Sequence, residues 1–320
     1  MHLPALPRPQ ERLQLATPHG SADALLLTHY AGLARPLTIL AASAHAAQRL
    51  KEEIGWLLPG KSVVMLPDWE TLPYDHFSPH HELISERLAS LWQIRNGEAD
   101  VIIVPVQTAM GVLPPLEYLT AYSFFLKKGQ KLDADKLRAD MTFAGYSHVT
   151  QVYGQGEFSI RGGLIDLFPM GSPLPYRIDL FDDEIETIRT FDIDSQRSLY
   201  PVPEIRLLPA REFPLDEGGR TKFRQRFREE FEGDPSKSRL YKDISTGSTP
   251  AGIEYYLPLF FDHTATLFDY LPGETVIALQ GDLHGAGVDV RPGRGDRRRQ
   301  RHGRRQDHRG HRAAAGGASG

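Results

Sequence analysis

Apolar and polar positions follow two different rhythms along the chain. Residues 21–115 alternate short apolar runs with longer amphipathic stretches, a pattern typical of a parallel sheet covered by helices. It predicts helices near 22–34, 44–57 and 81–95, and strands at Pro36–Ala42, Ser62–Pro67 and Asp100–Val106. The last of these contains Val101-Ile102-Ile103-Val104, which is apolar on both faces like a buried parallel strand. We therefore expect an α/β domain over residues 1–117, half of a doubly wound sheet.

The rhythm changes at about residue 118. One amphipathic stretch, Asp133–Tyr146, predicts a helix, and several short strands follow it, separated by Gly, Pro or acidic turns. This order of elements is typical of an antiparallel α+β unit. We expect a second domain over residues 118–209.

Residues 210–284 give a less complete pattern. They contain a charged amphipathic helix (216–232), a Gly/Ser/Thr/Pro-rich stretch (245–252), an aromatic run (Ile253–Phe261) and a strand-like Thr275–Gln280. These pieces do not suggest a core of their own. We expect them to be an incomplete continuation that packs back onto the first domain.

The last segment, residues 285–320, has a composition unlike the rest. From Arg291 onward it contains no Leu, Ile, Val, Phe, Tyr or Trp, so it cannot bury a core. Clustered arginines could form a nucleic-acid-binding arm, because they neutralise phosphates. The same mixture of Arg, Gly, Ala and His is also what a GC-rich gene gives out of frame. We expect a basic, disordered tail that is out of frame, and we assign it no function.

The overall composition bounds the class of protein. The 320 residues carry a net charge of −4, but residues 281–320 hold ten Arg and four Asp, so residues 1–280 are acidic with 27 basic against 37 acidic side chains. No apolar run reaches the roughly 18 residues of a membrane span. The absence of cysteine excludes disulfides and thiolate chemistry. We expect a cytoplasmic protein that does not bind a membrane, because the start also lacks a secretory signal.

The strand-like run Tyr176–Phe181 suggests a binding surface. Because side chains two apart share a strand face, Ile178 and Leu180 point one way, and Arg177, Asp179 and Phe181 the other. An arginine and an aromatic ring on a solvent face are enriched at binding hot spots. The alternative is structural: Phe181 would be core beyond a strand bulge, and Arg177 would pair with Asp179 or Asp183 at the surface.

Two groups of side chains could suggest metal sites. One is His76, His80, His81 and Glu82, whose spacing does not place three ligands on one helical face. The other is a set of carboxylates that could imitate a magnesium-dependent nuclease, comprising Asp179, Asp182, Asp183, Glu184 and Glu186. We interpret the first as a helix start and the second as a solvated acidic turn. No metal ligand and no catalytic residue is therefore assigned.

Three aromatic side chains, Trp69, Tyr74 and Phe77, are interleaved with Pro and Asp. Exposed rings of this kind could stack on nucleic-acid bases. Neighbouring Lys or Arg, which DNA binding normally requires, are missing. We favour a packing role for these rings and leave a DNA contact open.

Two long segments carry a specific resemblance. The first is residues 66–80 (LPDWETLPYDHFSPH) with 84–88 (ISERL), and the second is residues 156–169 (GEFSIRGGLIDLFP) with 176–186 (YRIDLFDDEIE). They resemble the amino-terminal module shared by bacterial transcription-repair coupling factors and UvrB. The resemblance extends from about residue 10 to about residue 283 and includes residues 250–255 (PAGIEY). It implies a degenerate, RecA- or helicase-like parallel-sheet domain with an inserted α+β domain that binds UvrA.

Two departures from UvrB favour the coupling factors. The aromatic segment at 69–77 runs almost directly into the predicted helix at 81–95, where UvrB carries a long damage-probing β-hairpin. The phosphate-binding loop of UvrB, G-x-x-x-x-G-K-[ST], is matched here by residues 16–23 (ATPHGSAD), which lack the Lys-Thr pair. We therefore expect no ATPase and no cofactor in this chain. ATP and magnesium would belong to the motor of the full-length family.

The resemblance also implies partners and site residues. In the family the inserted domain contacts UvrA, and the matching positions here are Arg161, Arg177 and Phe181, with Asp179 beside them. The expected function is an adaptor that recruits UvrA to stalled RNA polymerase in transcription-coupled nucleotide-excision repair. Contacts with RNA polymerase and DNA would come through domains beyond Gly320, and we expect a monomer. The alternative is a UvrB-like DNA-damage-binding helicase subunit.

Overall fold

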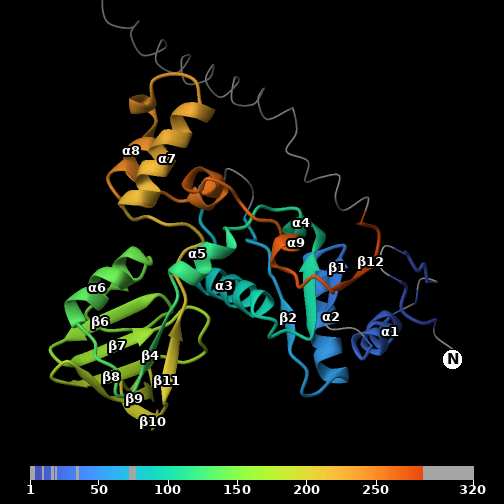
Figure 1. Cartoon of the computed structure of the whole chain (residues 1–320), viewed down its shortest axis with the longest axis horizontal. Helices are drawn as coiled ribbons and strands as arrows, with labels where there is room; N and C mark the ends of the chain where they lie inside the picture. The colour runs from blue at the N-terminus through green and yellow to red at the C-terminus, as the bar shows by residue number, and fades with distance from the viewer. Residues whose placement is uncertain are drawn as a thin grey trace, which may run out of the picture.

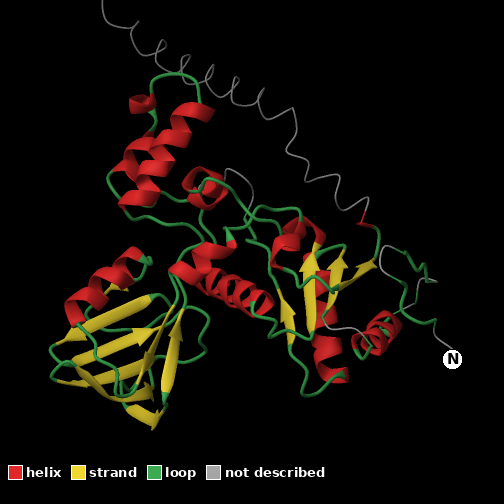
Figure 2. Ribbon diagram, in the orientation of Figure 1, coloured by secondary structure: helices red, strands yellow, loops and turns green. Residues whose placement is uncertain are grey.

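The protein is described by a computed structural model that covers residues 4–8, 11–15, 18, 20–33, 36–71 and 77–283 (Figure 1). The tail expected at 285–320, and the side chains of Tyr74 and His76, lie outside these residues. The fold is mixed α/β: a four-stranded parallel sheet, a six-stranded sheet that is antiparallel except at one edge, a two-stranded sheet and a small group of helices (Figure 2). No helix in the described part has the length and apolar content needed to cross a membrane.

The first sheet is parallel and has the order β12-β1-β3-β2. Its strands are β1 (Leu37–Ala41), β2 (Val63–Met65), β3 (Val101–Pro105) and β12 (Val276–Gln280). Every residue of β1 and β3 is buried, as expected for central strands covered on both faces. The three strands predicted from residues 36–106 are therefore confirmed.

Helices cover both faces of this sheet because successive strand side chains point to opposite sides. Helices α1 (Ala22–Ala31) and α2 (Ala44–Leu57) pack in one core cluster with Leu37, Ile39 and Ile103. Helix α3 (His81–Arg95) packs in another with Leu40, Ile102 and Val104. The bounds of α2 and α3 agree with the prediction, and the hydroxyl of Ser43 and the ring of His80 cap their first turns.

The second sheet has six strands in the order β10-β9-β8-β7-β6-β5. They are β5 (Ser147–His148), β6 (Glu157–Arg161), β7 (Leu164–Phe168), β8 (Tyr176–Phe181), β9 (Glu184–Phe191) and β10 (Ser198–Pro201). Helix α6 (Ala134–Phe143) covers one face, and its Leu137 and Met141 share a core cluster with Phe158, Ile165 and Ile178. The chain enters through β4 (Phe124–Lys127) and leaves through β11 (Glu204–Leu207), which pair antiparallel.

The third group of elements contradicts the expectation that these residues lack a core of their own. Helices α7 (Glu217–Glu230) and α8 (Arg239–Ser245) and the 3-10 helices η1 (Pro235–Lys237) and η2 (Ile253–Phe260) lie together. They bury a separate cluster rich in phenylalanine, comprising Phe213, Phe223, Phe227, Ile244, Ile253, Leu259 and Phe260. Sequence periodicity missed it because half of this core comes from η2 and the segment before α7, not from one amphipathic helix.

The chain then returns to the first sheet. Short helices α4 (Val106–Ala109), α5 (Leu116–Ala121) and α9 (Leu267–Tyr270) line this path. It is joined to the segment between α4 and α5 by a bridge between Ala265 and Leu113 and by a hydrogen bond from the Tyr270 hydroxyl to the Pro114 carbonyl. Strand β12 then pairs along all of β1.

Helix α3 lies between the two sheets (Figure 1), and its buried side chains belong to a core cluster that includes residues of both. The hydroxyl of Ser85, a buried residue of α3, accepts a 2.7 Å hydrogen bond from the amide of Gly171, which follows β7. Gly171 has φ +75°, and a Cβ there would lie 3.2 Å from that of Ala89 and 2.8 Å from a methyl of Leu208. Only glycine therefore allows this close approach without displacing a neighbour.

The same helix carries a buried ion pair. Arg87 and Glu212, whose side chains are 3% and 2% exposed, approach to 2.6 Å. Arg87 also donates to the carbonyl of Pro67 and lies 5.0 Å from the ring centroid of Trp69, whose Nε1 donates to Glu212. This Arg87–Glu212 junction joins α3, the segment after β2 and the segment after β11.

We expect Arg87→Ala to lower the free energy of unfolding by about 3–5 kcal/mol, because it leaves the Glu212 carboxylate buried without its cation. Chemical denaturation followed by tryptophan fluorescence measures this loss. Arg138→Ala, which removes an exposed i,i+3 pair with Asp135, is the matched control and should cost less than about 1 kcal/mol. Equal losses in the two variants would contradict a stabilising role for the junction.

A second prediction concerns pH and Glu254, which is buried in η2 and accepts a 2.9 Å hydrogen bond from Ser78. Burial raises the pKa of the Glu254 carboxyl, and the nearby Glu212 carboxylate raises it further. A carboxyl with a raised pKa stabilises the fold fully below its unfolded pKa, and the contribution is lost as the pH rises through the folded value.

We therefore expect the stability of the wild type, relative to Glu254→Gln, to fall over a pH range that begins at about 4, the pKa of an unfolded glutamate, and extends through the raised pKa of the folded state. Urea denaturation across this range measures the difference. Glu86→Gln on the exposed side of α3 controls for the loss of one negative charge. A difference that rises with pH would contradict this assignment.

Candidate protein-docking face

The outer face of the six-stranded sheet is the side not covered by α6. The strand register places its side chains in rows that run across neighbouring strands. Residues directly opposite one another on antiparallel strands project to the same side. One row comprises Ser159, Asp166, Arg177 and Arg189, and the next comprises Arg161, Leu164, Asp179 and Thr187. Polar side chains from four strands therefore share this surface, which we call the docking face.

A β-bulge sets the end of the docking face. Asp179 lies opposite Thr187, but Leu180 lies opposite Ile185, so Glu186 is an extra residue on β9. Leu180 keeps its contact with the core cluster, and Phe181 pairs with Glu184 at the tip of the hairpin. The side chain of Phe181 is 75% exposed. The alternative of a core position for Phe181 is therefore wrong, although a bulge does precede it.

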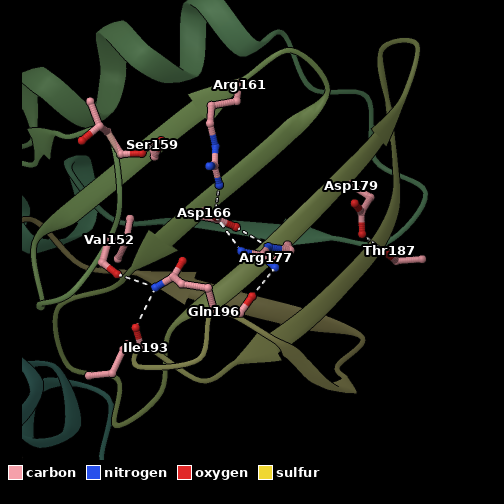
Figure 3. Close-up of polar contacts among 10 residues, drawn as sticks. Val152, Ser159, Arg161, Asp166, Arg177, Asp179, Thr187, Ile193 and Gln196 are labelled. Atoms are coloured by element: carbon pink, nitrogen blue, oxygen red, sulfur yellow. Dashed lines mark hydrogen bonds and ion pairs between the residues drawn. The ribbon is translucent and has the colours of Figure 1, made fainter.

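Asp166 is the centre of the docking face. Its side chain is 1% exposed and binds Arg177 through both oxygens, at 2.6 Å from Nε and 2.9 Å from Nη2 (Figure 3). Arg161 Nη2 reaches the same carboxylate at 2.7 Å. Hydrogen bonds to Asp166 raise the pKa of the Arg177 guanidinium. A buried carboxylate thus fixes two arginines from neighbouring strands.

Arg177 is held from its other side as well. Its Nη1 donates to the carbonyl of Gln196 at 2.9 Å, and its guanidinium lies 5.0 Å from the ring centroid of Phe191. Gln196 has φ +57°, which is uncommon for a residue with a Cβ, and its side-chain amide donates to the carbonyls of Val152 and Ile193 (Figure 3). The loop between β9 and β10 therefore presents the Gln196 carbonyl to Arg177 in a fixed position.

The structure brings the four residues predicted from the sequence onto one face but gives them different environments. Arg161 is 51% exposed and Phe181 projects into solvent, whereas Arg177 is only 14% exposed. Asp179 accepts a 2.7 Å hydrogen bond from Thr187. The alternative pairing of Arg177 with Asp179 or Asp183 is wrong, because its carboxylate partner is Asp166.

Sequence reasoning missed Asp166 and Gln196. The signal for Asp166 was present, since a lone carboxylate interrupts the apolar strand Leu164–Phe168. A buried charge in such a strand needs a cation, and Arg177 occupies the directly opposite position on β8. Gln196 acts mainly through its backbone carbonyl, so its residue type gave no comparable signal.

The acidic turn beyond Phe181 contacts the segment before α6 through Asp183. Asp183 forms a 2.8 Å ion pair with Lys131, and its carbonyl accepts from the amide of Leu132. The Asp183 pKa is lowered by the hydrogen bond from Lys131. Within the described residues, no group of three or more His, Asp or Glu side chains is arranged to hold a metal ion.

The aromatic segment before α3 divides in two. Trp69 packs edge to face against Tyr255, with ring centroids 5.1 Å apart, and takes part in the Arg87–Glu212 junction. Its predicted packing role is confirmed. Phe77 is 71% exposed, so the packing role predicted for this ring is wrong. Tyr74 lies outside the described residues.

The position of the degenerate phosphate-binding loop is only partly described, since Ala16, Thr17 and His19 lie outside the described residues. Asp23, at the end of that stretch, forms a 2.6 Å ion pair with Arg49 and accepts a 2.9 Å hydrogen bond from Gln280 of β12. Burial would raise the pKa of Asp23, but its hydrogen bonds, that from Arg49 foremost, lower it overall. The ion pair between Asp23 and Arg49 thus lies where the phosphate-binding motif would end.

Comparisons with known proteins agree with this geometry. The family described as the UvrB interaction domain matches residues 124–213, from the first residue of β4 to just beyond β11. The transcription-repair-coupling factor of Escherichia coli strain K12 is 46% identical over 266 residues, 82% of this chain. Those of Haemophilus influenzae and Bacillus subtilis are 46% and 29% identical, each over 259 residues.

The chain spans less than a quarter of these relatives. It covers 23% of the Escherichia coli protein and 22% of each of the other two. The similarity therefore concerns one part of a much longer protein, and that part includes the docking face.

We expect Asp166→Ala to lower the free energy of unfolding by about 3–5 kcal/mol, because it leaves Arg177, mostly buried, without a counter-charge. Asp179→Ala, which removes an acceptor for one hydrogen bond on the same face, should cost about 1 kcal/mol. Chemical denaturation of both variants measures the contrast. A smaller loss for Asp166→Ala than for Asp179→Ala would show that Asp166 does not organise the face.

Proposed function

We propose that this chain is an adaptor that binds UvrA. The premise is that it carries the UvrB interaction domain and is related over four fifths of its length to the transcription-repair-coupling factors. The contact is made by the docking face, with Phe181 inserted into an apolar pocket of the partner. Arg161 adds a charge-assisted hydrogen bond at the rim. Arg177 and Asp166 hold the face in shape.

The observation that carries this proposal is the exposure of Phe181. A phenylalanine that is 75% exposed leaves most of its apolar surface in water, so its burial by a partner would be favourable. It lies at the tip of a hairpin held by backbone hydrogen bonds from Leu132 to Asp183 and from Ile185 to Gln130, so its position is set before binding. A rigid exposed aromatic loses little conformational entropy when it binds, which favours its use as an anchor.

The wider role follows from the name of the relatives. We infer that UvrA binding by this part recruits excision repair to stalled RNA polymerase. Contacts with RNA polymerase and DNA, and ATP-driven movement with its magnesium, would belong to portions of the relatives that this chain does not span. The part described here would then be an adaptor and not an enzyme, acting as a monomer in the cytoplasm.

The competing function is a UvrB-like subunit that binds damaged DNA and hydrolyses ATP. Two features weigh against it. Residues 16–23 lack the Lys-Thr pair that holds phosphates, and Asp23 at the end of this stretch is bound to Arg49. The segment between Trp69 and α3 is also too short for a long hairpin. Both features favour the adaptor.

We expect Phe181→Ala to weaken UvrA binding by at least about 2 kcal/mol, roughly 30-fold in Kd, as for a buried aromatic anchor. Isothermal titration calorimetry of this chain with purified UvrA measures the change. Phe143→Ala is the matched control, because Phe143 is an exposed phenylalanine on α6, against the opposite face of the sheet. It should bind like the wild type.

Arg177 is a poorer probe than Phe181 because its loss also disturbs Asp166. Phe181 has no such internal role, so Phe181→Ala should unfold like the wild type. If a folded wild-type chain fails to bind UvrA, or if Phe181→Ala binds as tightly as Phe143→Ala, the adaptor proposal fails.

A further inference from the structure

Arg189 has a place on the docking face that the stability of the fold does not explain. It lies on β9 directly opposite Arg177 of β8, and both side chains project to the outer face. The Arg189 side chain is exposed, and it forms no hydrogen bond or ion pair with any residue that the structure describes. Its neighbour Arg177 is mostly buried and fully engaged.

The arrangement of charges is unfavourable in the isolated protein. Like charges directly opposite one another in a sheet are destabilising. Asp166, the carboxylate in the same row, is already bound by Arg177 and Arg161, so little of its charge remains to attract a third arginine. In its own row, Arg189 thus meets a cation and no free acid.

The docking face is therefore divided by charge. Phe181 lies at one end beside the exposed Glu184, while Arg189 lies four residues further along the strands. At about 3.3 Å per residue, the two rows are roughly 13 Å apart. Along the strand direction Arg161 lies in the row between them, but it is on β6, three strands from β9, and it is half exposed. The end that carries the arginines suits an acidic group of a partner.

We propose that Arg189 forms a carboxylate-binding subsite of the docking face, separate from Arg161, which lies three strands away and is bound to Asp166. The subsite receives an acidic side chain of the partner segment whose apolar group covers Phe181. This inference rests on the proposed function, because it names the chemistry of that same contact. Opposite charge there would speed association and fix the orientation of the partner, and the partner carboxylate would relieve the repulsion between Arg177 and Arg189.

The test is calorimetric binding of the whole chain to UvrA at two salt concentrations. Arg189→Ala should bind several-fold more weakly than the wild type, and Arg189→Glu at least about tenfold more weakly, since it places like charges together. The salt dependence of the affinity should decrease in Arg189→Ala. Arg138→Glu, which changes an exposed arginine of α6, is the matched control and should bind like the wild type.

A stability measurement separates a docking residue from a structural one. Arg189→Ala should have an unfolding midpoint equal to or above that of the wild type, because it removes a repulsion. Arg177→Ala should have a lower midpoint, because it breaks the pair with Asp166. If Arg189→Ala lowers the midpoint as far as Arg177→Ala does, Arg189 is structural and the inference is overturned.

The binding outcomes also separate this inference from the proposed function. If Phe181→Ala loses binding while Arg189→Glu binds like the wild type, the subsite is overturned and the adaptor remains. If the folded wild type does not bind UvrA at all, both fail together. Loss of binding in Arg189→Glu with retention in Arg138→Glu supports the subsite.

Discussion

The Arg87–Glu212 ion pair is the interaction on which the arrangement of the whole chain depends. It joins the helix between the two sheets to the segment that leaves the antiparallel unit, more than one hundred residues later in the sequence. Both charges are out of water, so each is tolerable only while the other is present. The pair therefore specifies one arrangement of α3 against both sheets, where apolar contacts alone would accept several.

The docking face repeats this logic on a smaller scale. Asp166 is buried and must be paired, and its pairing fixes Arg177 and restrains Arg161 at the surface. Phe181 takes the next outward position after Asp179 at the end of the same strand, so it projects into solvent while Leu180 faces the core. Buried electrostatics thus fix the polar part of the face, and backbone geometry presents the aromatic part. Two exposed groups remain on this face. Phe181 has most of its ring in solvent, and the Arg189 side chain forms no hydrogen bond or ion pair with the described residues.

Much of this architecture could be predicted from the sequence because local patterns specified it. The continuous apolar run Val101–Val104 identified a central parallel strand, and Ser43 and His80 precede helices that begin where predicted. The faces predicted for β8 were also correct to its end, with Leu180 against the core and Phe181 exposed. Period-two reasoning could not locate the bulge on β9, because an extra residue on the partner strand leaves no mark on β8 itself.

The misses have physical causes. The partner of Arg177 depended on strand register, which is a long-range property, so nearby Asp179 and Asp183 seemed closer in sequence than Asp166 proved to be in space. The helical cluster around Phe223 and Phe260 combines residues that lie 37 positions apart in the sequence, on elements none of which has a complete apolar face. Phe77 belongs to a segment whose rings do not share one environment, since Trp69 is packed and Phe77 is exposed.

The pairing of β4 with β11 has a consequence for how such a protein can arise. Phe124 and Leu207, near the two ends of the antiparallel unit, lie opposite one another across adjacent strands. A segment of more than eighty residues thus starts and finishes at nearly the same point in space. Such a segment can be gained by a host fold at a single surface loop, and it can be lost or exchanged, without separating the strands on either side. The antiparallel unit can therefore be transferred between folds as one block, and the paired strands β4 and β11 are the place where it joins the rest of the chain.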